Sequence, residues 1–167
     1  MSRQFVLLFV FSLIFGMSEF SVFGKEKGDL LDSLYNQAKS EAYRIEVTRV
    51  MSASVPNTDR FNPSGFMEVN DSLVQARLPF FGKAYSSRYG EDAGINIEGT
   101  AENMKIERKK KQVDIRFDIR DKNERYQVFI QLFPGGNASV RLNSNQREAI
   151  SYYGTYKFFN AKLKNQN

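Results

Sequence analysis

Apolar and charged residues alternate most regularly in Val113-Asp-Ile-Arg-Phe-Asp-Ile-Arg120. The apolar residues occupy every second position, and Asp and Arg residues fall between them. Successive side chains of a β-strand point to opposite faces, so this spacing predicts a strand with one buried and one solvated face. We interpret Asp114, Arg116, Asp118 and Arg120 as a surface ladder suited to cross-strand ion pairs.

The chain on the C-terminal side of this segment continues as strands. Residues 121–124 read as a turn, and residues 126–133 are apolar on both faces, which predicts a central strand covered on both sides. Gly135-Gly136-Asn137 predicts a tight hairpin turn. Residues 138–142 return from that turn, and residues 149–156 make a last strand before a polar tail at 157–167.

The N-terminal side begins with a helix and then changes period. Apolar residues at three-to-four spacing predict a helix over 25–42, with Asp29 and Asp32 in its first turn. Further strands are predicted at 43–47, 67–70, 73–78, 95–97 and 103–108, with a loop at 52–65. The fold class is therefore mainly β (α+β): an antiparallel sandwich or open barrel of about eight strands with one N-terminal helix.

The first 24 residues have the organisation of a secretory signal peptide. Arg3 precedes an uncharged apolar run over 5–17, and the segment closes on Val22-Phe23-Gly24. The run is shorter than the roughly 20 residues of a membrane span. We expect cleavage after Gly24, a single mainly-β domain over 25–167, no membrane span in the mature chain and a periplasmic or secreted location. The chain contains no Cys, so it is not expected to be a lipoprotein.

The composition excludes several kinds of active site. The chain of 167 residues contains no His and no Cys, which removes most transition-metal sites and every mechanism based on a His base or a Cys nucleophile. No cofactor, metal or catalytic motif is predicted, and we expect a protein that is not an enzyme. The net charge of +5 permits acidic partners, but nucleic acid is not expected for an exported protein.

Two segments combine aromatic residues with glycine, at 78–94 and 150–156. Aromatic planes beside Arg, Asn and Gln donors suit the binding of a sugar ring or a peptide. In a second interpretation, Gly82 and Gly154 permit bends and the rings fill the core. The candidate ligand-binding residues are Phe81, Tyr85, Arg88, Tyr89, Arg147, Tyr152 and Tyr153, and the partner would be an envelope protein or glycan.

Two alternative functions remain open at this point. Glu91 and Asp92 would suit a carboxylate-dependent hydrolase of envelope glycans, although adjacent residues usually point apart and a loop ion pair with Arg88 is the simpler reading. The basic run at 108–111 would suit a protein that associates with a membrane surface. The same run also suits a hairpin tip whose lysines discourage strand pairing.

The run Leu78-Pro-Phe-Phe-Gly-Lys-Ala-Tyr85 and the block Asn145-Gln-Arg147, followed by Ile150-Ser-Tyr-Tyr-Gly154, carry a family resemblance. The chain resembles an uncharacterised Bacteroidetes family of exported proteins, domain of unknown function 4251, from about residue 45 to residue 156. The resemblance implies no activity. It does imply O-glycosylation at Asp-Ser followed by an apolar residue, a pattern present at Ser33 and Ser72. Ser72, in its turn, is the better candidate.

Overall fold

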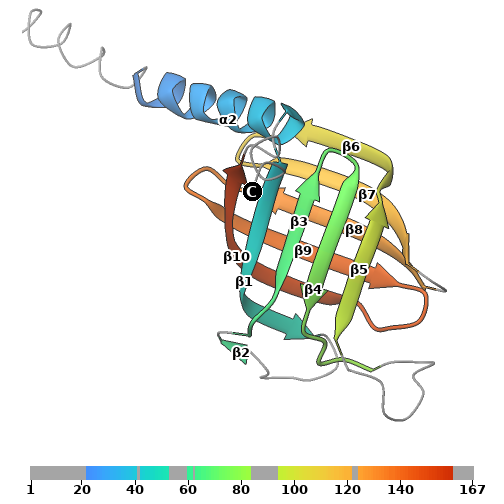
Figure 1. The fold of residues 1–167 in the computed structure, drawn as a ribbon. Helices are drawn as coiled ribbons and strands as arrows, with labels where there is room; N and C mark the ends of the chain where they lie inside the picture. The colour runs from blue at the N-terminus through green and yellow to red at the C-terminus, as the bar shows by residue number, and fades with distance from the viewer. Residues whose placement is uncertain are drawn as a thin grey trace, which may run out of the picture.

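The computed structural model describes residues 22–40, 42–52, 60–61, 63–83, 94–121 and 124–159. In these ranges one antiparallel sheet is accompanied by one helix, α2 (Val22–Ser40), which lies across one end of the sheet (Figure 1). The strands are β1 (Ala42–Ser52), β2 (Arg60–Phe61), β3 (Phe66–Asn70), β4 (Leu73–Leu78), β5 (Ile95–Thr100), β6 (Glu102–Arg108), β7 (Val113–Asp121), β8 (Glu124–Leu132), β9 (Asn137–Ser144) and β10 (Ile150–Phe159).

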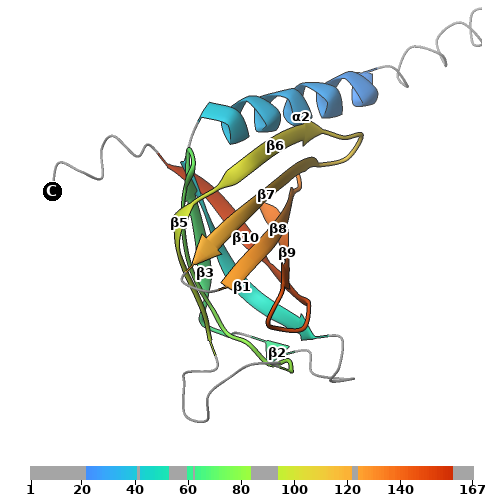
Figure 2. The same cartoon turned by 90° about the vertical axis from the view of Figure 1, so that its right-hand side faces the viewer.

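The strands follow the order β5-β4-β3-β1-β10-β9-β8-β7-β6, and the two-residue β2 pairs with β1. The sheet curls until its edge strand β5 faces β6 and β7 at the other edge (Figure 2). Ala101 alone links the two edge strands β5 and β6, and a Cβ built on Gly99 of β5 would lie 3.2 Å from the Arg120 carbonyl oxygen of β7. The fold is therefore a barrel that is nearly closed, which confirms the open barrel of the two predicted architectures.

The alternation in β7 places its apolar residues in the interior, as predicted. Val113, Ile115, Phe117 and Ile119 face the interior and are at most 3% exposed. The apolar residues of β1, β8, β9 and β10 meet them there and form one core. The hairpin turn between β8 and β9 is also confirmed, because Gly135 (φ 96°) and Gly136 (φ 88°) adopt the left-handed conformation that such turns require.

The helix differs from the prediction at both ends. It begins at Val22, so its first turn contains no acidic residue, and the expected cut after Gly24 lies in that turn. It ends at Ser40, because Ala42 is already a buried residue of β1. Its buried side chains, which include Leu34 and Ala38, lie on the side of the sheet formed by β6 and β7.

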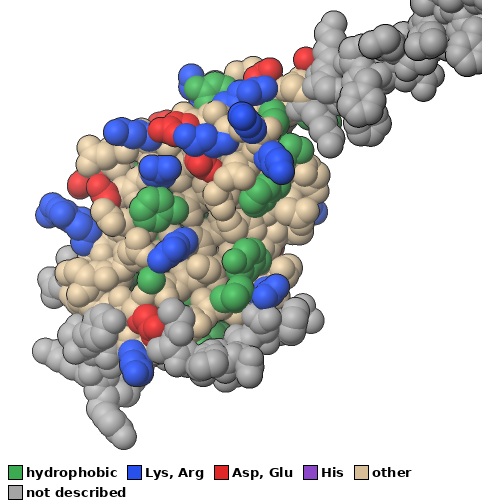
Figure 3. Space-filling model, turned by 180° about the vertical axis from the view of Figure 1, so that it is seen from behind, with side chains coloured by type: hydrophobic (Ala, Val, Ile, Leu, Met, Phe, Trp, Pro, Cys, Tyr) green, Lys and Arg blue, Asp and Glu red, His purple; other side chains and the backbone are tan. Residues whose placement is uncertain are grey.

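Two further predictions need correction at the C-terminal strands. β8 is central in the sheet but is not covered on both faces, because Phe129 and Phe133 are only half-buried. Figure 3 shows the molecule from behind, where hydrophobic side chains remain visible between basic ones. β10 continues past residue 157, because the Phe158 ring packs edge-on against Tyr43 with 6.0 Å between the centroids.

Candidate functional site

The structure describes four of the seven predicted binding residues. Phe81, Arg147, Tyr152 and Tyr153 lie within the described ranges, whereas Tyr85, Arg88 and Tyr89 lie outside them. The predicted acidic pair at residues 91 and 92 also lies outside the described residues.

Tyr152 and Tyr153 point to opposite faces of β10. Tyr152 is fully buried, and its hydroxyl donates a hydrogen bond to the Pro79 carbonyl oxygen at 2.9 Å. Tyr153 is 41% exposed on the outer face, where the guanidinium carbon of Arg49 lies 5.4 Å from its ring centroid. The two rings therefore do not form one surface, and Tyr152 serves the core as the second interpretation of these aromatic residues expected.

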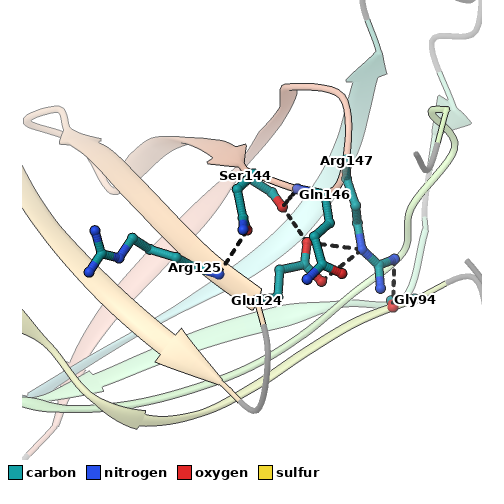
Figure 4. Close-up of polar contacts among 7 residues, drawn as sticks. Gly94, Glu124, Arg125, Ser144, Gln146 and Arg147 are labelled. Carbon is teal, nitrogen blue, oxygen red and sulfur yellow. Dashed lines mark hydrogen bonds and ion pairs between the residues drawn. The ribbon is translucent and has the colours of Figure 1, made fainter. Parts of the chain in front are cut away.

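Arg147 lies between β9 and β10 and joins three parts of the chain (Figure 4). Its Nε lies 3.1 Å and 3.2 Å from the two carboxylate oxygens of Glu124, at the start of β8. Its Nη1 donates to the Gly94 carbonyl oxygen at 3.4 Å, just before β5. Its guanidinium carbon lies 5.3 Å from the centroid of the Phe80 ring, just after β4. These residues, with Ser144, are called the Arg147 cluster below.

Glu124 is held on both sides. The Ser144 hydroxyl donates to Glu124 Oε1, and the Gln146 backbone N–H donates to the Ser144 hydroxyl at 2.9 Å (Figure 4). Only 11% of the Glu124 side chain and 22% of the Arg147 side chain are exposed. The sequence did not point to Glu124, because it belongs to no motif and lies 20 positions from Ser144.

Arg147 holds the chain at Gly94, and Glu148, the next residue, holds it at Lys83. The Glu148 backbone N–H donates to the Lys83 carbonyl oxygen at 3.0 Å, and the Glu148 carboxylate accepts from the Lys83 N–H at 3.2 Å. Phe81, two residues earlier, is partly buried against the core. Two consecutive residues therefore fix the described chain on either side of residues 84–93, at Lys83 and at Gly94.

Two buried tyrosines lie behind the Arg147 cluster. Burial, followed by the hydrogen bond to Glu124, raises the pKa of Tyr126 above its ordinary value. Burial, followed by the neighbouring Tyr126, raises the pKa of Tyr152, although Arg147 acts in the opposite direction. Both hydroxyls therefore stay protonated at neutral pH. The Glu124 carboxylate is engaged by Arg147 and Ser144, so the cluster ties the start of β8, the end of β9 and the chain before β5 together.

The described residues contain no group of three or more acidic side chains placed to hold a metal ion. In the basic run at 108–111, Arg108 pairs with Asp32 of α2, and Lys109 pairs with Glu107. The hydrogen bond from Lys109 lowers the pKa of the Glu107 carboxyl. No helix in the described part of the chain combines the length and the apolar character needed to cross a membrane.

Ser72 lies in the hairpin turn between β3 and β4. Asp71 before it has a φ of 54°, and Leu73 after it is 60% exposed. The Ser72 side chain is half-buried, and its carbonyl oxygen accepts a hydrogen bond from the Ala101 N–H at 2.7 Å. The pattern of the predicted O-glycosylation site is therefore displayed on a turn.

A family model described as a domain of unknown function (DUF4251) matches residues 26–156. The structure is similar to the crystal structure of a DUF4251 family protein from Bacteroides eggerthii DSM 20697, with a TM-score of 0.57 and 19% identity. The match covers 80% of this chain and 90% of that one. No curated protein matches the sequence. The chain belongs to the DUF4251 family.

Proposed function

We propose that this protein is an exported, non-enzymatic binding module that recognises an envelope protein or glycan through the segment 80–94. Its sequence contributes Phe81, Tyr85, Arg88 and Tyr89. The observation that carries the proposal is the attachment of this segment at both ends by Arg147 and Glu148. Binding residues are commonly found on loops that a rigid scaffold positions.

The chemistry of the attachment supports binding rather than catalysis. The two carboxylates at this attachment are both engaged, Glu124 by Arg147 and Glu148 by the Lys83 N–H. The rings and the Arg88 guanidinium between the two attachments have the chemistry that stacks on sugars or clasps a peptide.

The first experiment is capture from envelope extract with the tagged full chain, together with a glycan array. For an identified ligand, the double variant Tyr85→Ala/Tyr89→Ala is compared with Tyr153→Ala, an exposed tyrosine on the outer face of β10. We expect the double variant to bind at least tenfold more weakly and Tyr153→Ala to bind as the unchanged chain does. Equal binding by all three proteins would refute the assignment of the site.

Export is tested separately. Expression of the full chain in a Bacteroidetes host should release a periplasmic or secreted protein. Its intact mass should equal that of a chain that begins at Lys25. A cell-associated protein of full mass would contradict the predicted signal peptide.

A further inference from the structure

Charged side chains form rows across the outer face of β6, β7 and β8, and each row carries charges of one sign. Seen from behind the molecule, acidic side chains lie among basic ones (Figure 3). The rows alternate along the strands as acidic, basic, acidic and basic, and they are called rows one to four below. In each row the register places two like charges directly opposite each other: Glu107 and Asp114, Lys105 and Arg116, Glu102 and Asp118, Arg120 and Arg125.

A β-bulge places the carboxylate of Glu102 in row three. The register between β6 and β7 shifts between Glu102 and Lys105, and Asn103 in this stretch has a φ of 56°. Without the extra residue of the bulge, Asn103 would lie opposite Asp118. The bulge therefore puts an acidic residue where a neutral one would stand, and the Asn103 side-chain amide instead donates to Asp118 at 3.4 Å.

These rows lower the stability of the single chain, because like charges directly opposite each other on antiparallel strands are destabilising. No ion pair joins Arg116, Arg120 or Arg125 to another described residue. The prediction that the charges of β7 form cross-strand ion pairs is therefore wrong for these residues. Elsewhere in the same sheet, Arg44 of β1 lies opposite Glu68 of β3 and forms an ion pair with it at 3.4 Å.

We propose that this striped face, defined as the eight residues of rows one to four, is the surface through which two copies of the chain form a dimer. A half-turn about an axis that lies across the strands, above Phe117 of β7, reverses the order of the rows. Row one of each copy then faces row four of the other, and row two faces row three. Every row meets a row of opposite sign. The proposal does not rest on the binding function proposed above.

The alternation of the rows selects this orientation of the second copy. A half-turn about an axis parallel to the strands would place each row on the same row of the other copy, and like charges would meet. A symmetric dimer uses the same patch of both subunits, so the patch must be complementary to itself. The two acidic rows balance the two basic rows, so the striped face has no net charge that would favour a polyanion or a polycation.

The uncharged positions of β8 fit the same orientation. Phe129 lies in row two and Gln127 lies in row three, so the half-turn brings the half-buried Phe129 ring over the second copy's Gln127. Four rows on the four strands β6 to β9, with strands about 4.8 Å apart and about 3.4 Å per residue, cover about 500 Å² of each copy. Standard interfaces bury about 800 Å² per partner, so we expect a dimer that dissociates readily.

The test is sedimentation velocity of the full chain and of charge-reversal variants at low salt. The row-three variant, Glu102→Lys/Asp118→Lys, makes row three basic. The row-two variant, Lys105→Glu/Arg116→Glu, makes row two acidic. Each variant brings like rows together in a dimer with itself. In a mixed dimer of the two variants, every row again meets a row of opposite sign.

The matched control is the row-one variant, Glu107→Lys/Asp114→Lys. It has the same charge as the row-three variant but a different order of rows. In a mixed dimer of the row-one and row-two variants, two of the four row contacts bring like charges together. Thermal melting of each variant establishes that it is folded.

We expect the unchanged chain to dimerise at low salt and to dissociate at high salt, because the Debye length falls from about 30 Å at 0.01 M to about 3 Å at 1 M. Each variant alone should dimerise at least tenfold more weakly than the unchanged chain. The mixture of row-two and row-three variants should restore the affinity to within threefold, and the mixture of row-one and row-two variants should not. An unchanged chain that stays monomeric at low salt, a dimer that high salt leaves intact, single variants that dimerise as the unchanged chain does, or equal association in the two mixtures would overturn the proposal.

Discussion

Gly154 of β10 lies against the backbone of β1 at a point where the register between the two strands shifts. A Cβ built on Gly154 would collide with the Glu46 carbonyl oxygen, and would lie 2.8 Å from the Glu46 carbonyl carbon and 3.2 Å from Val47 Cα. Non-bonded carbon atoms need about 3.5–4.0 Å. All of these neighbours are backbone atoms, so in Gly154→Ala the strands themselves must separate by about 1 Å.

That separation lowers the free energy of unfolding in two ways. Two ladder hydrogen bonds beside the shift would be lost at about 1 kcal/mol each. Overpacking of a close contact adds about 1–3 kcal/mol. The free energy of unfolding should therefore fall by about 3–5 kcal/mol, a large part of the 5–15 kcal/mol typical of a domain.

The assay is urea unfolding followed by far-ultraviolet circular dichroism. The control is Gly28→Ala in α2, where an added Cβ meets nothing within 4 Å. Alanine in a helix is more favourable than glycine by about 0.5–1 kcal/mol, so the control should gain stability. A loss below about 1 kcal/mol in Gly154→Ala would refute the argument from close approach.

Three other predictions concern charge and burial. Arg120→Gln should raise the free energy of unfolding by about 0.2–0.5 kcal/mol in urea titrations, because it removes the like charge opposite Arg125; a decrease would contradict it. Tyr152→Phe should lower that free energy by about 1–2 kcal/mol, because the buried Pro79 carbonyl oxygen loses its donor; unchanged stability would show that the hydrogen bond is dispensable. The pKa of Tyr126 and Tyr152 is raised in the folded state, so folding retains protons that the unfolded chain releases above about pH 10. The contribution of these two tyrosines to stability should therefore be constant below that pH and fall above it, which ultraviolet titration of tyrosinate against unfolding would follow; ionisation of both groups in the folded protein near pH 10 would contradict this.

The local features of the fold were predictable from the sequence, because they depend on neighbouring residues. The alternation in β7 fixes which residues face inward, and the glycines at 135 and 136 fix a hairpin turn. The same period of two already implies that Tyr152 and Tyr153 point to opposite faces. The strand predicted around them therefore does not allow both rings to lie on one face of the sheet.

Contacts between distant segments were not predictable in this way. Glu124 and Arg147 are 23 positions apart and meet only because the end of β9 returns beside the start of β8. The apolar pattern of β8 predicts cover on both faces, whereas in the structure the outward Phe129 ring is only half-buried, with the Arg116 side chain beside it. That β7 forms no cross-strand ion pair with the described residues likewise depends on which residues the register places opposite it.

The position of β1 beside β10 has a consequence for the order in which the protein acquires its structure. Tyr43 of the first full strand pairs with Phe158 of the last, whereas β7, β8 and β9 pair with their immediate neighbours in the chain. Pairing between distant segments slows folding, because a long loop must close before any contact is gained. A chain still emerging from the ribosome can form the hairpins but lacks the partner of β1. Until β10 has been synthesised, β1 and β9 each present an unpaired edge, which is the feature that leads incomplete β-proteins to aggregate.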